Sequence, residues 1–212
     1  MHALTLTGVG ERAHLLSPDI HLSTHIQDVV AAIENEELQD VADRIPERLG
    51  HVVYVDAVVP KPGEAWSATH ASATREARLK AAQANALYSL PPPGPELFGL
   101  EGDDAAWVAR RQTPHPGHPY TDVLDFDPAR VARVPRTYIH CTRPTLATID
   151  AIWPRVNDPK FWDGLWLPGS RRLELATGHD PMVSAPQELT DVLLECVRSQ
   201  ATHSPSPPTV LR

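Results

Sequence analysis

A few histidines, carboxylates, hydroxyls and thiols of this sequence stand where they could take part in proton transfer. His179 lies in a Thr-Gly-His turn, and Asp56 directly follows the apolar run of residues 52–55. A carboxylate can orient an imidazole, and the imidazole can then take the proton of a Ser or Cys nucleophile. Each residue also has a structural interpretation, because His179 is a loop histidine beside a glycine and Asp56 can cap the next turn.

The candidate nucleophiles are less well placed than this pair. No G-x-S-x-G motif, the strand-to-helix turn that exposes a nucleophilic serine, occurs in the 212 residues. Ser17, Ser170 and Cys141 are the alternatives. Ser170 precedes a predicted strand, at the edge of the sheet opposite to Asp56, whereas Cys141 ends a strand but is expected to be buried. We therefore predict that none of them is an efficient nucleophile.

The eleven histidines raise the question of a metal site. His115 and His118 are the closest pair, but prolines and a glycine surround them and no Cys or acidic partner follows at ligand spacing. We interpret this pair as part of a solvated loop, and we predict neither a metal site nor a cofactor. The tryptophans fit core packing or the lining of an apolar acyl pocket, and both interpretations stay open: Trp66, Trp107, Trp153, Trp162 and Trp166.

The elements that must position these residues alternate between strands and helices. Strands are predicted at residues 51–57, 137–141 and 172–175. Helices are predicted at about 24–37, 41–49, 74–86, 103–111, 145–153, 159–162 and 185–197. The β-branched run at 51–57 is typical of a parallel strand covered on both faces. The fold class is α/β, with a parallel sheet in a three-layer arrangement.

One domain is expected over residues 1–201, with a helical cap inserted at about 65–130. The Pro- and Ser-rich residues 202–212 are expected to be a disordered tail. The two cysteines, Cys141 and Cys196, each lie in an apolar stretch, which favours buried free thiols over a disulfide.

Composition excludes several classes of partner. The net charge is -8, and no block of Lys or Arg occurs, which argues against nucleic acid. The apolar runs are far shorter than the roughly 20 residues of a membrane span, and no secretory leader opens the chain. We therefore expect a cytoplasmic protein with no membrane partner.

Three groups of segments carry more specific information. They are 6–16 (LTGVGERAHLL) with 25–30 (HIQDVV); 43–48 (DRIPER) with 53–57 (VYVDA); and 177–182 (TGHDPM) with 185–186 and 188–189. In this order they resemble the bacterial α/β-hydrolases related to plant salicylate esterases and hydroxynitrile lyases. Residues 112–116 and 135–142 fit the same family, so the resemblance spans about 3–198.

This resemblance implies acyl transfer by a Ser-His-acid triad acting on a small apolar ester or aromatic molecule. His179 matches the catalytic base. Asp56 is the expected acid, because it lies at the carboxyl edge of the sheet and because residues 142–144, at the more usual position of the acid, contain no carboxylate.

The chain departs from the family pattern at two places. About fifteen residues with the nucleophile strand and its turn are absent between Val41 and Ala42. The front is also short, so the loop that supplies an oxyanion donor is missing. The remnant is expected to keep three strands, and its two helices near residues 24–49 are expected to fuse into one. We expect an inactive or severely impaired esterase, with a non-catalytic binding or interaction protein that uses the cap pocket as the alternative.

Overall fold

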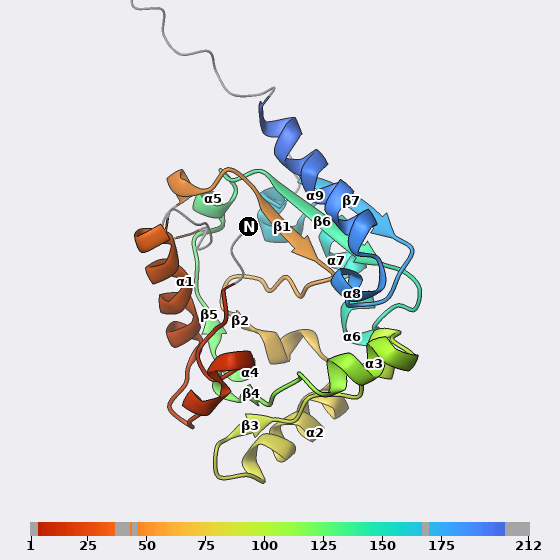
Figure 1. Cartoon of the computed structure of the whole chain (residues 1–212). Coiled ribbons are helices and arrows are strands. Elements are labelled where there is room, and N and C mark those ends of the chain that lie inside the picture. The colour runs from red at the N-terminus through yellow and green to blue at the C-terminus, as the bar shows by residue number, and fades with distance from the viewer. Residues whose placement is uncertain (1–3, 37–42, 44–45, 167–169, 202–212) are drawn as a thin grey trace, which may run out of the picture.

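A parallel sheet of three strands forms the centre of the computed structural model, which describes residues 4–36, 43, 46–166 and 170–201. The strands β1 (Val52–Val55), β6 (Arg136–Cys141) and β7 (Ser170–Leu175) lie in the order β1-β6-β7 (Figure 1). Both pairings are parallel, with Tyr54 opposite Tyr138 and Tyr138 opposite Arg172. The predicted α/β class and the parallel sheet are confirmed.

Helices cover both faces of the central strand. Thr137 and Tyr138 are neighbours on β6, so their side chains point to opposite faces. Thr137 contacts Cys196 of α9 (Pro186–Ala201), with 3.5 Å between Oγ1 and Sγ. Tyr138 packs into a buried cluster that includes Val156 of α7 (Trp153–Asn157). Every residue of β6 is buried, as expected for the middle strand of a covered sheet.

The edge strand β1 departs from the prediction of a strand covered on both faces. All four of its residues are only half-buried. The described residues contain no strand on its outer side, and an apolar hollow of about 380 Å³ lies against it. Tyr54, Val58, Val29 and Leu6 are among its lining residues. The run of β-branched residues predicted the strand correctly. How far the strand is buried depends on which elements pack beside it, and the local sequence does not determine these.

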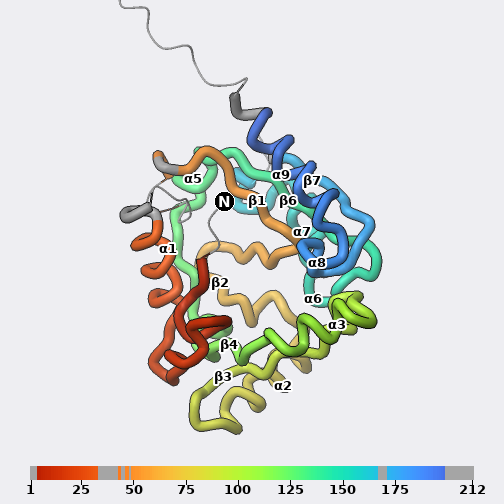
Figure 2. Tube along the Cα trace, viewed as in Figure 1, coloured from red at the N-terminus to blue at the C-terminus, as the bar shows by residue number. Residues whose placement is uncertain are grey.

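The first helix of the chain, α1 (Leu22–Glu36), stands apart from the sheet across this hollow (Figure 2). It begins at Leu22, two residues before the predicted start at about 24. The carboxylate of Asp122 accepts the Leu22 N–H at 2.8 Å. A cap from 100 positions away cannot be read from local sequence.

Among the described residues of 41–49 the predicted helix is wrong, and its predicted fusion with α1 falls on residues 37–42, which lie outside the described residues. Asp43 lies in a turn, and Pro46–Arg48 forms only a short 3-10 helix, η2. Proline in a helix interior removes a hydrogen bond and clashes with the preceding turn, so Pro46 opposes a continuous helix. The junction between Val41 and Ala42 lies outside the described residues, as does the predicted tail at 202–212.

Between β1 and β6 the chain forms a layer of short elements beyond the carboxyl ends of the strands (Figure 1). Its two-stranded antiparallel sheets pair β2 (Glu64–Ala65) with β5 (Val123–Leu124) and β3 (Ser89–Leu90) with β4 (His115–Pro116). Its helical elements are η3 (Trp66–Thr69), α2 (Ser72–Gln83), η4 (Pro95–Phe98), α3 (Gly102–Ala109) and α4 (His118–Thr121). The chain then returns to the other end of the strands, where α5 (Pro128–Val131) precedes β6 (Figure 1). The predicted helices at 74–86 and 103–111 correspond to α2 and α3.

The remaining helical elements are short and flank the strand ends. They are η1 (Gly10–Leu15), α6 (Ala147–Asp150), η5 (Phe161–Gly164) and α8 (Pro181–Ser184). The predicted helix at 145–153 is divided between α6 and α7, and the one at 159–162 is a 3-10 turn. Both cysteines are free and buried, as predicted. No helix within the described ranges is long and apolar enough to cross a membrane.

Candidate active site

Two loops bring a carboxylate and an imidazole together at the carboxyl edge of the sheet. Asp56 directly follows β1, and His179 lies in the loop between β7 and α8. Parallel strands end at the same edge, which is where open α/β sheets gather ligand-binding residues. Asp56 is fully buried and has a positive φ of 43°. A non-glycine residue in this region is strained, and such residues concentrate at functional sites.

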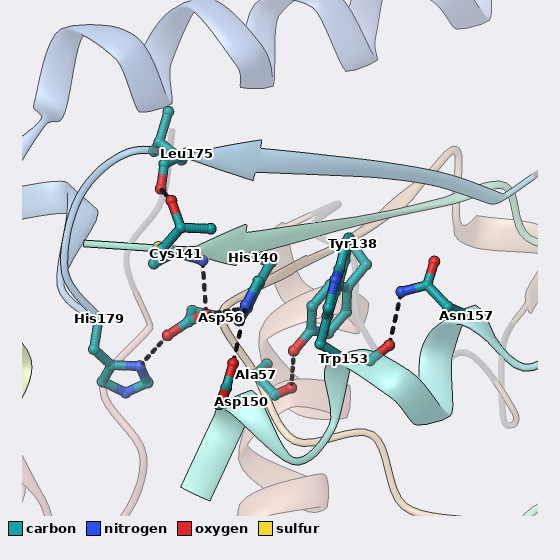
Figure 3. A network of polar contacts seen from close by, with 11 residues as sticks. Asp56, Ala57, Tyr138, His140, Cys141, Asp150, Trp153, Asn157, Leu175 and His179 are labelled. Atoms are coloured by element: carbon teal, nitrogen blue, oxygen red, sulfur yellow. Dashed lines mark hydrogen bonds and ion pairs between the residues drawn. The ribbon is translucent and has the colours of Figure 1, made fainter. Parts of the chain in front are cut away.

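The two side chains share a hydrogen bond (Figure 3). His179 Nδ1 lies 2.8 Å from Asp56 Oδ2. A carboxylate oxygen can only accept, so Nδ1 carries the hydrogen and Nε2 is the position for a lone pair. The other carboxylate oxygen, Oδ1, accepts the backbone N–H of Cys141 at 2.8 Å. Both oxygens of Asp56 are therefore held, and the carboxylate holds the imidazole in turn.

The backbone of His179 is fixed by a close approach between two loops. Its N–H donates to the carbonyl oxygen of Phe98 at 3.0 Å, and the Phe98 and His179 rings lie 5.2 Å apart. A side chain at Gly178 would collide with that carbonyl group and with the backbone of Gly99. The Thr-Gly-His turn thus needs glycine because another backbone occupies the place of a Cβ atom.

A second histidine, His140 of β6, lies beside the same carboxylate and was not singled out in the sequence. Its Nδ1 is 3.4 Å from Asp56 Oδ1 but forms no hydrogen bond there, and its ring stacks on Trp153 at 4.8 Å. Its Nε2 is 3.6 Å from Asp150 (Figure 3). The sequence did offer one signal for His140. It lies near the end of a predicted strand, two positions before Thr142, and the carboxyl end of that strand lies at the same edge of the sheet as Asp56.

His179 opens onto a cleft of about 270 Å³ between the strand ends and the cap layer. Most of the lining is aromatic or aliphatic, and a few polar groups face the same space. The lining includes Trp66, Leu90, Phe98, Leu146, Ile149, His70, Arg78, Gln112, Thr113, His115, Thr148 and His179. An apolar cleft with a few convergent polar groups is the usual form of a small-molecule site.

One wall of the cleft contains a buried polar pair. His70 Nδ1 and the Tyr120 hydroxyl share a hydrogen bond of 2.8 Å. Burial, and then the nearby Arg78 guanidinium, lowers the pKa of His70 to about 4, so the ring is neutral at pH 7. Arg78 stands 5.7 Å from the ring centres of both Trp66 and Tyr120. This wall thus combines a hydrogen-bonded neutral pair with the positive charge of Arg78.

The structure separates the candidate nucleophiles from the histidine. Cys141 is fully buried, and burial together with the charges of Asp56 and Asp180 raises the pKa of its thiol to about 12. Ser170 begins β7, at the end of the strand away from His179. Ser17 lies in the loop before α1, where its hydroxyl accepts the N–H of Asp19.

The remaining predicted residues take separate places. His115 Nδ1 shares a hydrogen bond of 2.8 Å with the carbonyl oxygen of Pro116. The His118 ring stacks on the His21 ring with 4.1 Å between their centres, so His115 and His118 do not face a common site. Trp66 lines the cleft, Trp162 and Trp166 pack in the core, and Trp107 is exposed. Burial raises the pKa of the Asp180 carboxyl.

Comparison with known proteins gives one match in sequence and several in structure. No family model matches the chain. A carbendazim-hydrolysing esterase from Nocardioides sp. (strain SG-4G) is 34% identical to this chain. The alignment is 212 residues long, and it covers 89% of this chain and 84% of that protein.

Among solved structures, the chain is similar to an extracellular α/β-hydrolase from a Paenibacillus species, with a TM-score of 0.70, 16% identity and coverage of 90% and 84%. It is also similar to a mutant of polyneuridine aldehyde esterase, with a TM-score of 0.64, 14% identity and coverage of 92% and 86%. A methylesterase from Arabidopsis gives a TM-score of 0.56, 15% identity and coverage of 92% and 85%. These structural likenesses concern the fold.

Proposed function

Because this chain belongs to the α/β-hydrolase family of esterases, we propose that its cleft binds a small apolar ester or aromatic molecule beside His179, with ester hydrolysis absent or severely impaired. The observation that carries the proposal is the 2.8 Å hydrogen bond between His179 Nδ1 and Asp56 Oδ2. We assign His179 as the base and Asp56 as the acid that orients it.

The geometry of this pair suits general base catalysis. A base needs a fixed ring with a lone pair toward the reacting group, and Asp56 fixes the ring through Nδ1. The His179 side chain is 25% exposed, whereas Asp56 is fully buried. The buried carboxylate can stabilise a positive imidazole, and the exposed side of that imidazole lines the cleft.

The cleft itself supports the substrate class. Trp66, Phe98 and Ile149 offer apolar surface for an acyl or aromatic group. Arg78, Gln112 and Thr113 offer donors for a carbonyl oxygen. The Nocardioides relative is by its name an esterase that hydrolyses carbendazim, and a small carboxylic ester is the class that we propose for this chain.

The impairment follows from the absent nucleophile. No G-x-S-x-G occurs in the sequence, and the thiol of Cys141 is buried and protonated at pH 7. Thr113 and Thr148 line the cleft, but among the described residues neither of them forms a hydrogen bond with His179. A base without a nucleophile to activate loses the covalent route of the family. The oxyanion donor that normally follows the nucleophile is lost with it, which costs a further factor of about 10² to 10³.

Non-catalytic binding of an aromatic small molecule is the second candidate. The observation that favours it is the Trp66 ring, which lines the cleft and packs against the buried Tyr120 ring 4.9 Å behind it. Trp66, with Phe98 in the same lining, can hold a planar ligand by stacking without any reaction.

Two measurements on the full chain test the proposal. We expect no labelling by a fluorophosphonate probe and no turnover of p-nitrophenyl butyrate above background. We also expect saturable binding of methyl benzoate by calorimetry. Thr148→Trp, which fills the cleft, should abolish this binding. Val123→Trp, at a side chain 60% exposed outside the cleft, is the matched control and should leave it unchanged.

The outcomes separate the candidates. Labelling at any serine or rapid turnover contradicts the impairment and shows another nucleophile. Absent binding, or binding that survives Thr148→Trp, contradicts the assigned cleft. Binding without labelling that persists in His179→Ala favours the purely non-catalytic candidate.

A further inference from the structure

Two histidines and an aspartate meet where α1 begins. His21 precedes α1, His118 opens α4, and Asp122 follows α4 directly. His21 Nδ1 lies 3.1 Å from Asp122 Oδ2. The rings of His21 and His118 are stacked, with their centres 4.1 Å apart and an interplanar angle of 23°. One ligand atom from each residue lies within 4.8 Å of the other two.

We propose that His21, His118 and Asp122 form a binding site for a divalent cation of the Zn²⁺ type. Two imidazoles and one carboxylate are ligands that borderline cations such as Zn²⁺ and Ni²⁺ prefer, whereas Mg²⁺ and Ca²⁺ prefer oxygen ligands alone. Three protein ligands leave a fourth position of a tetrahedral cation for water.

The local backbone places two of the ligands together. His118 has an acidic partner after all, because Asp122 lies four positions after it and its N–H donates to the His118 carbonyl oxygen at 2.7 Å. Side chains at this spacing face the same side of a helical turn. The third ligand, His21, comes from a segment 101 positions before Asp122 and completes the cluster through tertiary contact.

The carboxylate is already oriented by a second partner. Asp122 Oδ2 accepts the backbone N–H of Leu22 at 2.8 Å. Its other oxygen, Oδ1, lies at the longer distance of 3.4 Å from His21 Nδ1. Oδ1 is therefore the oxygen available to a cation, while Oδ2 keeps the start of α1 in place. An oriented ligand of this kind is typical of metal sites.

The cluster needs only a small contraction to bind. Zn²⁺ at about 2.0–2.1 Å from each ligand sets neighbouring ligand atoms about 3.3 Å apart. The widest separation, 4.8 Å, must shrink by about 1.5 Å. The His21 side chain is 48% exposed and can turn about its own torsions to do so.

Binding at this site would tie the start of α1 to a wall of the cleft. The short helix α4 carries Tyr120, which is fully buried and bonded to His70. A cation held by His21 and His118 would add a cross-link between α1 and α4. A ligand that binds only the folded chain raises the free energy of unfolding, and this stabilisation grows with the logarithm of the ratio of ligand concentration to Kd.

Calorimetric titration of the full chain with Zn²⁺, without a polyhistidine tag and after dialysis against a chelator, tests the site. We expect one saturable Zn²⁺ per chain and a Zn²⁺-dependent rise in Tm. Because losing even an outer partner of a ligand weakens metal binding by about 10- to 100-fold, His21→Ala and His118→Ala should each weaken it by about 100-fold or more. His14→Ala, at an exposed histidine outside the cluster, is the matched control and should bind as the wild type does.

Either of two results would overturn the site. One is a wild-type chain without saturable binding up to roughly 0.1 mM Zn²⁺, which corresponds to less than about 6 kcal/mol of binding free energy. The other is equal binding, or an equal rise in Tm, in the double variant His21→Ala/His118→Ala. His21→Ala is the decisive single variant if His118→Ala unfolds, because the His21 side chain is half-exposed.

Discussion

Asp56 and His179 are 123 positions apart in the sequence, and their side chains meet at 2.8 Å across the end of the central strand. Asp56 follows β1 and His179 follows β7, while β6 lies between these two strands. The N–H of Cys141, at the end of β6, holds the other oxygen of Asp56. One buried carboxylate thus connects the ends of all three strands.

Replacing the Asp56 carboxylate should weaken its hydrogen bonds to His179 and to the Cys141 N–H and lower the stability of the fold. The Asp56 carboxylate accepts one hydrogen bond from His179 and one from the Cys141 N–H. The neutral amide of Asp56→Asn has only one accepting oxygen, so one of these buried donors loses its partner, which costs about 1–3 kcal/mol. We expect the free energy of unfolding in urea to fall by that amount, and the Nδ1–H proton signal of His179 to be lost from the NMR spectrum. Asp150→Asn, at a side chain 56% exposed, is the control and should change neither.

Restoring the missing part of the family pattern should restore activity. We expect a chimera that receives a nucleophile strand with its G-x-S-x-G turn and an oxyanion-donor loop from an active α/β-hydrolase to hydrolyse p-nitrophenyl esters. His179→Ala in this chimera should lower kcat by about 10³-fold or more, because the triad acts as a unit. Asp56→Asn should remove a large part as well. Full activity of the Asp56→Asn chimera would assign the acid to another carboxylate.

Gly178 should be essential for the position of His179. In Gly178→Ala the new methyl group meets the Phe98 carbonyl group, which is backbone and cannot turn away. Strain of this kind typically costs about 1–3 kcal/mol of unfolding free energy. Gly94→Ala is the matched control, because its new methyl group meets only the flexible end of Glu96. Equal stability of the two variants, measured by urea denaturation, would contradict the close approach.

The neutral state of His70 should make stability fall between pH 6.5 and pH 4. Burial, with Arg78 nearby, lowers its pKa from 6.5 to about 4, so the unfolded chain takes up a proton in this window that the folded chain does not. The stability present above pH 6.5 is lost progressively as the pH falls toward 4. We expect His70→Gln to lack this loss, which is on the order of 2–3 kcal/mol. Urea denaturation of both proteins at pH 7 and 4.5 gives the difference, and parallel pH profiles would contradict a buried neutral ring.

The ion pair of Glu64 and Arg155 should stabilise the fold above pH 4.5. Burial alone would raise the pKa of Glu64, but hydrogen bonds from Arg155, at 2.6 and 3.2 Å, and from the Lys61 N–H outweigh it and lower the pKa. A lowered carboxyl pKa gives stability that is complete above the unfolded value of 4.5 and is lost as the pH falls through the folded value.

We therefore expect Glu64→Gln to cost about 1–3 kcal/mol at pH 7 and much less at pH 3. Glu195→Gln breaks the exposed pair with Arg171 and is the control, with an expected change within about 0.5 kcal/mol. A cost of Glu64→Gln that stays the same at pH 3 would rule out this electrostatic origin.

Local patterns were sufficient to predict the three strands of the central sheet and the longer helices, but not the two-residue strands β2 to β5. The apolar runs that became β1, β6 and β7 and the periodic run that became α9 carry their signal within a few neighbours. The predicted start of α1 was wrong because a distant residue, Asp122, caps the helix at Leu22. The helix predicted at 41–49 was wrong although Pro46, which opposes it, stands in the local sequence.

By itself the sequence determined the family, the α/β class, the absence of a G-x-S-x-G motif, and which histidine and aspartate to consider. Only the tertiary structure decided that His179 and Asp56 are hydrogen-bonded, that His140 joins them, and that His118 faces His21 and not His115. It also decided that β1 is half-exposed. The physical reason is that residue type and spacing encode local backbone preference, whereas contacts between residues far apart in the chain depend on how strands and helices pack.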